Sequence, residues 1–292
     1  MKPAPFEYFA PTSLEEALAC LDEHGYDAKV MAGGQSLIPT MNFRLAEPEI
    51  LVDLNRISEL SYIDPGKSGG LRIGAMTRQR EAERSTLVKE RAPLVHETMP
   101  YIAHPQIRNR GTVGGSIAHA DPASELPAVM LALDARFLLR SKDDERRLSA
   151  DEFFIGLFDT AMEPEELLVE ISLPAMPPNS GWAFREIARR HGDYALVGVA
   201  AVVTADQTGR CENARITFLS VGDGPVVAVE AGQGLTGQNP TEDIIRAAAE
   251  TAAAKDIDPP NDIHASAEYR RHLAKVLTTQ ALSEAFARAK GV

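Results

Sequence analysis

Cysteine is scarce in this sequence. Only Cys20 and Cys211 occur among the 292 residues, so a disulfide-stapled scaffold is excluded and a reducing compartment is favoured. An iron–sulfur cluster takes four protein ligands, which two thiols cannot supply. Any cluster of this kind that works with the chain therefore has to belong to another chain.

Long apolar runs and a secretory leader are also lacking. The longest apolar run, residues 194–205, is too short to cross a bilayer and is typical of a buried strand. The opening residues, Met1 to Phe6, do not show the charged-then-apolar pattern of a secretory signal. We therefore expect no transmembrane segment and a cytoplasmic location.

Positive charge is in short supply, since the formal net charge is −12. A broad nucleic-acid-binding surface is not expected for such a chain. If the protein binds an anionic ligand, local backbone dipoles and a few placed side chains must act against the overall field.

The usual fingerprints of nucleotide binding and catalysis are missing too. No Gly-x-Gly-x-x-Gly follows a strand, so a Rossmann dinucleotide site is not indicated. Ser36 does not lie in a Gly-x-Ser-x-Gly elbow. His96 has no second histidine four residues later, and the seven histidines form no ligand pattern. We expect neither a catalytic acid, base or nucleophile nor a metal site on this chain.

Local patterns predict an α+β fold. A helix is expected over residues 13–24, where Thr12 or Ser13 can cap an apolar stripe. Thr77 can cap a second helix that runs towards Ser85. Further helices are predicted over 91–103 and 123–133, and strands over 29–31, 50–54, 71–75, 136–140 and 167–173.

A proline-rich run, residues 174–181, separates this part from the rest of the chain. No helix or central strand tolerates such a run, so a domain boundary is predicted there. Strands over 182–187, 195–203 and 214–219 then precede helices over 241–254 and 266–289. Strands grouped before helices are typical of an α+β domain.

Two paired-glycine segments stand out, Ala32–Ser36 and Thr112–Ser116. Paired glycines allow a positive φ and close approach of the backbone to a ligand. Successive N–H groups can then converge on an anion, with serine and threonine hydroxyls at the rim. Two such loops could hold a diphosphate, although each could also be an ordinary tight turn.

The flanking residues resemble a known family. The stretches AGGQSLIP from Ala32, LVDLNRI from Leu51, IRNRGTVGGSIAHADPASELP from Ile107 and SAEYRRHL from Ser266 are similar to the FAD-binding medium subunit of molybdenum hydroxylases, the carbon monoxide dehydrogenase and xanthine dehydrogenase group. The resemblance covers nearly the whole chain. It implies a two-lobed FAD-binding domain of the p-cresol methylhydroxylase type over 1–176, with lobes of about 1–57 and 58–176. A smaller α+β flavoprotein C-terminal domain, antiparallel strands plus helices, is implied over 177–292.

The resemblance also implies a set of cofactor contacts. The pyrophosphate contacts carried over by position are Ala32, Gly33, Gly34, Gln35, Ser36, Thr112, Val113, Gly114, Gly115 and Ser116, and Leu37 is a further cofactor-binding residue. Ile102 and Leu168 fall where the family has apolar neighbours of the flavin. Glu125 stands where many members have an aspartate. Tyr194 matches an aromatic residue near the flavin ring, and Arg185 matches a lysine of the xanthine dehydrogenases.

The function implied is electron transfer. FAD would lie on this chain, with the molybdenum cofactor on a large partner subunit and two [2Fe–2S] clusters on a small one. Electrons would pass through FAD to an external acceptor, in an (αβγ)₂ assembly. Two alternatives remain open from the sequence: a self-sufficient flavin-dependent reductase or oxidase, and a non-enzymatic nucleotide-binding module.

Overall fold

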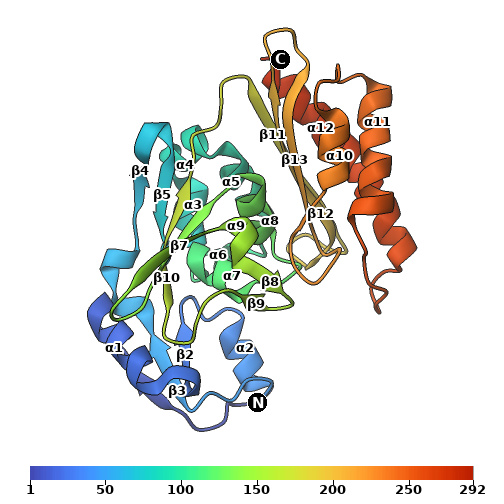
Figure 1. Cartoon of the computed structure of the whole chain (residues 1–292). Coiled ribbons are helices and arrows are strands. Elements are labelled where there is room, and N and C mark those ends of the chain that lie inside the picture. Colours follow the sequence, from blue (N-terminus) through green and yellow to red (C-terminus); the bar gives the residue numbers. More distant parts are fainter. Residues whose placement is uncertain (292) are drawn as a thin grey trace.

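A small parallel sheet forms the N-terminal lobe of the computed structural model, which describes residues 1–291 (Figure 1). Its strand order is β1-β3-β2. The strands are β1 (Glu7–Phe9), β2 (Ala28–Met31) and β3 (Ile50–Asp53), and the helices are α1 (Leu14–His24) and α2 (Leu37–Asn42). Ser13 caps α1 by accepting the Glu16 N–H, and the predicted apolar stripe of this helix is buried. The helix predicted over 13–24 is thereby confirmed.

A five-stranded antiparallel sheet, ordered β4-β5-β10-β6-β7, forms the second lobe. Its strands are β4 (Ile63–Pro65), β5 (Leu71–Gly74), β6 (Arg136–Arg140), β7 (Glu145–Ser149) and β10 (Leu167–Leu173), and a hairpin of β8 (Phe154–Gly156) and β9 (Asp159–Thr160) lies beside it. The strands predicted over 136–140 and 167–173 are confirmed with the same bounds. β5 ends one residue earlier than the predicted strand over 71–75.

Short helices pack on this second sheet and complete the lobe's core. They are α3 (Gln79–Arg84), α4 (Thr86–Arg91), α5 (Pro93–Thr98), α6 (Pro105–Arg108), α7 (Val113–His119), α8 (Glu125–Ala132) and α9 (Ala150–Phe153). The prediction that Thr77 caps a helix is wrong. The Thr77 hydroxyl instead bonds the backbone of Tyr62, and the helix that follows has Arg78 as its N-cap residue.

A four-stranded antiparallel sheet and three helices form the C-terminal part (Figure 1). The strands are β11 (Ser180–Ala188), β12 (Ala195–Ala205), β13 (Cys211–Leu219) and β14 (Val226–Val227), and the helices are α10 (Val229–Leu235), α11 (Glu242–Thr251) and α12 (Ala267–Ala289). The three strands and two helices predicted here are confirmed. The sheet lies between two layers, because α12 and α10 cover one face and α5 and α8 pack against the other.

Single helical turns connect several of these elements. They are the 3₁₀ turns Gly25–Asp27, Leu54–Arg56, Ser58–Leu60, Lys67–Gly69 and Met99–Tyr101, and the π turn Ala252–Asp256. Across residues 1–291, no helix combines the length and the apolar character that a membrane crossing requires.

Candidate cofactor-binding site

The two paired-glycine segments lie against each other where the two N-terminal lobes meet. A Cβ atom added at Gly33 would stand 2.5 Å from the carbonyl oxygen of Arg110 and 2.7 Å from the Cα of Gly111. A Cβ at Gly115 would stand 3.2 Å from the Cβ of Ala32. Since such separations are shorter than ordinary van der Waals contact, the bare glycines are what allow the two segments to touch.

Only one of the four paired glycines needs a left-handed backbone. Gly34 has a φ of 72°, whereas Gly33, Gly114 and Gly115 do not lie in that region. The positive φ that paired glycines allow is therefore used at one of these four positions. At Gly114 the requirement is space, because a Cβ there would stand 2.5 Å from the Cβ of Ala75.

The first segment has unused hydrogen-bond donors. Within residues 1–291, the backbone N–H groups of Gly33, Gly34, Gln35 and Ser36 donate to no protein acceptor. The Gln35 side chain folds back, and its Nε2 donates to the Gly33 carbonyl over 3.0 Å. Four successive free N–H groups around a positive-φ glycine are the donor set that an anionic ligand requires.

The second segment is the first turn of α7, so the prediction of a second loop is wrong. Thr112 is the N-cap, and its hydroxyl accepts the Gly115 N–H over 3.0 Å. The N–H groups of Val113 and Gly114 donate to the carbonyls of Thr77 and Ala75, both over 2.9 Å. The backbone donors of this turn are thus already used within the protein.

The second segment therefore contributes to the site through its side chains and its shape. Within the described part of the chain, neither the Ser116 hydroxyl nor the Ser36 hydroxyl makes a hydrogen bond to protein. The bare Gly115 lets this turn approach Ala32 of the first segment. Free N–H groups on the first segment and a free hydroxyl on the second are donors of the kind that a diphosphate needs.

Two polar side chains that the sequence pattern does not single out connect the first segment to the residues just before the second. The Asn55 Nδ2 donates to the Ala32 carbonyl over 2.8 Å. The Arg78 guanidinium donates to the Asn55 Oδ1 over 2.6 Å and also to the Arg110 carbonyl. One signal could have found Asn55: it follows β3, which pairs in parallel with β2. The carboxyl ends of two adjacent parallel strands meet at one edge of a sheet.

Three further predicted contacts in the two lobes, Leu37, Ile102 and Leu168, lie outside the two glycine segments. Leu37 is half-buried as the first residue of α2. Ile102 and Leu168 belong to the core of the second lobe, with only 8% and 5% of their surface exposed. The structure thus places Ile102 and Leu168 mainly as packing residues of the lobe that carries the second segment.

Glu125, which is buried, and Glu186, which is partly buried, form an acidic pair in which the charge of the first acts on the second. Glu125 is the first residue of α8, and burial raises the pKa of its carboxyl to about 7. Burial, and then the nearby charge of Glu125, raises the pKa of Glu186 on β11 to about 8. The Glu186 Oε2 is buried without a hydrogen-bond partner in the described chain. Strand alternation could have indicated Glu186, because it shares the face of the core residue Phe184.

The two cofactor contacts predicted in the C-terminal part, Tyr194 and Arg185, lie in different surroundings. Tyr194 follows the turn between β11 and β12 and is 68% exposed. Arg185 is committed elsewhere, because its guanidinium pairs with Glu284 of α12 and lies 3.9 Å from Glu97 of α5. The structure therefore does not bring Arg185 to the glycine segments.

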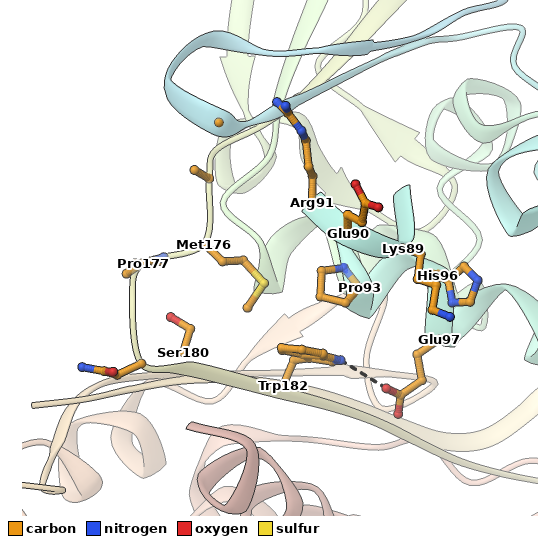
Figure 2. A pocket seen from close by; sticks show the side chains of 13 residues that line it. Lys89, Glu90, Arg91, Pro93, His96, Glu97, Met176, Pro177, Ser180 and Trp182 are labelled. Atoms are coloured by element: carbon orange, nitrogen blue, oxygen red, sulfur yellow. Dashed lines mark hydrogen bonds between the residues drawn. The ribbon is translucent and has the colours of Figure 1, made fainter. Parts of the chain in front are cut away.

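A separate groove of about 590 Å³ lies beside the 174–181 linker, between the helical layer and β11 (Figure 2). Lys89, His96, Met176 and Trp182 are among its lining residues, and the Trp182 Nε1 donates to Glu97 over 3.2 Å. None of the predicted cofactor contacts lines this groove. The chemistry indicated by the glycine segments is therefore not located there.

Comparisons with known proteins match the chain in two parts. Residues 4–176 match the FAD binding domain in molybdopterin dehydrogenase, and residues 182–285 match the CO dehydrogenase flavoprotein C-terminal domain. The chain is 43% identical to the 6-hydroxypseudooxynicotine dehydrogenase complex subunit alpha of Paenarthrobacter nicotinovorans, covering 99% of this chain and 97% of that one. It is 40% identical to the caffeine dehydrogenase subunit beta of a Pseudomonas species, covering 98% and 96%.

A solved structure is similar over the same extent. The carbon monoxide dehydrogenase of Hydrogenophaga pseudoflava, in a form that lacks the Mo-pyranopterin moiety of the molybdenum cofactor, contains a chain that aligns with a TM-score of 0.95. Sequence identity is 40%, and 99% of each chain is covered.

Proposed function

Because the chain belongs to the family of FAD-binding medium subunits of carbon monoxide dehydrogenase-type molybdenum hydroxylases, we propose that it is the electron-transfer subunit of such an enzyme. In this role it takes electrons from [2Fe–2S] clusters of a small partner subunit. It passes them through FAD to an external acceptor. Bound FAD supplies the redox chemistry, and the protein binds and orients it.

The observation that carries the proposal is the packed pair of glycine segments with free N–H groups on one side. Ala32–Leu37 would hold the diphosphate mainly through backbone donors. Thr112–Ser116 would close the other side through the Ser116 hydroxyl and the bare Gly115. Glu125 and Tyr194 would contact other parts of the cofactor, with Ile102 and Leu168 packed behind.

The chain's own groups suit binding rather than substrate oxidation. The relatives named above act, by their names, on a nicotine derivative, on caffeine and on carbon monoxide. Substrates this different, in enzymes whose matching chains are each 40–43% identical to this one, support a substrate site on another subunit. We place it on a molybdenum-containing large subunit, in an (αβγ)₂ assembly.

The same proposal sets the division of the chain. Residues 1–176 would form the FAD-binding domain, with lobes of about 1–57 and 58–176, and residues 177–292 the C-terminal domain. The proline-rich linker between β10 and β11 supports that boundary.

The visible spectrum of the purified chain tests the proposal. We expect flavin absorbance bands, and release of FAD rather than FMN on denaturation. A colourless chain that fails to take up added FAD would contradict the proposed function. Co-expression with the partner genes should yield a complex that contains molybdenum and iron. Turnover of a small substrate by the isolated flavin-loaded chain would favour a self-sufficient flavoenzyme instead.

A further inference from the structure

We propose that Asn55 and Arg78 are positioning residues that fix the spacing of the two glycine segments. The proposal rests on the function proposed above. The contacts run in one line: the Ala32 carbonyl accepts from Asn55, Asn55 accepts from Arg78, and the Arg110 carbonyl accepts from Arg78. Ala32 opens the first segment, and Arg110 lies two residues before the second.

The Asn55 amide has a single orientation that satisfies all its partners. Its Nδ2 donates to the Ala32 carbonyl over 2.8 Å and to the Asp53 Oδ1 over 2.5 Å, while its Oδ1 accepts from Arg78. A flipped amide would set oxygen against two acceptors. The Tyr8 hydroxyl donates to the other Asp53 oxygen over 2.5 Å, so the carboxylate behind Asn55 is itself held in place.

Arg78 links the second lobe to this amide through its side chain, while its backbone is anchored within that lobe. The guanidinium fork reaches Asn55 with one nitrogen and the Arg110 carbonyl with the other. The backbone of Arg78 forms an antiparallel bridge with Thr112, the cap of α7. A lysine has no planar fork and cannot make both contacts in this geometry.

The reason for such a connection is that the proposed diphosphate donors, the N–H groups of the first segment and the Ser116 hydroxyl of the second, belong to different lobes. A hydrogen bond weakens steeply as its geometry departs from the optimum. A shift of one lobe against the other would therefore break donor contacts on one side. Arg78 also brings a positive charge close to the first segment, in a chain whose net charge is −12.

Ligand titrations of the FAD-depleted chain test the inference, with calorimetry as the readout. We expect Asn55→Ala to weaken binding of both FAD and ADP by about tenfold or more. Arg78→Lys keeps the charge and should weaken both in the same direction. The matched control is Arg146→Lys, because Arg146 also joins a carbonyl, that of Ala161, to a polar side chain, Glu166, without touching the site.

AMP separates positioning from a general loss of structure, because it lacks the diphosphate. A positioning role lowers the ratio of ADP to AMP affinity in both variants, whereas partial unfolding lowers both affinities alike. Wild-type affinity for ADP in Asn55→Ala and in Arg78→Lys would overturn the inference and leave the proposed function standing. If Asn55→Ala fails to fold, Arg78→Lys alone decides. A wild-type chain that binds neither FAD nor ADP would overturn the proposed function itself.

Discussion

Glu186→Gln should change how the stability of this protein depends on pH. Glu186 lies on β11 with a buried carboxylate oxygen that has no hydrogen-bond partner in residues 1–291. Burial, together with Glu125, raises its pKa to about 8 from an ordinary value of 4.5. The folded protein therefore keeps this carboxyl protonated at pH values where the unfolded chain has already ionised it.

The sign and the size follow from this difference. Because the folded pKa is the higher one, full stability is present below about pH 4.5 and is lost as pH rises towards 8. The 3.5 pH units between the two values, at 1.36 kcal/mol each, give about 5 kcal/mol as an upper limit. Water entry around the charged form reduces the loss of stability below this upper limit. The expected loss is about 1–3 kcal/mol, the usual cost of an unsatisfied buried acceptor. Glutamine does not ionise, so the variant should lack this loss.

Urea denaturation of the FAD-depleted chain at pH 5, 6, 7, 8 and 9 measures the effect. Trp182 is the only tryptophan and lies on β11 itself, so its fluorescence reports on the strand that carries Glu186. Glu212→Gln is the control, because Glu212 is an exposed residue on β13, another strand of the same sheet. If wild type and Glu186→Gln lose stability in parallel between pH 5 and pH 8, the reasoning from burial is refuted.

Two further predictions concern the glycine segments. Gly33→Ala should lower the FAD content of the purified chain at least about tenfold, judged by the ratio of flavin to protein absorbance, because its Cβ would meet the Arg110 carbonyl at 2.5 Å. Gly156→Ala, with no atom within 4 Å of the added Cβ, should leave that ratio unchanged, and equal ratios in both variants would contradict the packing argument. Thr112→Val removes the hydroxyl that caps α7 and should lower the free energy of unfolding by about 1 kcal/mol in urea denaturation, whereas an unchanged value would show that the cap is dispensable.

The fold could be predicted where local pattern and burial agree. β6 and β10 alternate or run apolar between clear breaks, so their bounds were predictable to the residue. The sequence VGGSIAH of α7 does not predict a helix, because its two glycines disfavour helix formation. It is helical because the carbonyls of Ala75 and Thr77 accept its first N–H groups, and those contacts come from a distant strand end.

The candidate site was predictable as two segments but not as an arrangement. Paired glycines and hydroxyls are visible in sequence, and the flanks point to FAD. That Gly33 lies over Arg110, and that Asn55 and Arg78 join the lobes, depends on how two separate sheets meet. No periodicity encodes such a junction, because it is a long-range contact between lobes. For Arg185, matching by position predicted a cofactor contact that the structure does not support. Its guanidinium forms an ion pair with Glu284 instead.

The acidic pair also bears on how an acidic chain holds an anion. Glu125 is one of the proposed cofactor contacts, and its charge acts on Glu186, so at pH 7 the raised pKa values of the two carboxyls would keep much of their negative charge away from the proposed cofactor. As pH rises from 7 to 9 both carboxyls ionise, and the added repulsion should weaken FAD binding. Glu186→Gln should reduce this loss of affinity, measured as FAD dissociation constants at pH 7, 8 and 9. An affinity loss of equal size in variant and wild type would show that the pair does not act on the cofactor, and would leave the backbone donors of the first segment as the dominant source of anion binding.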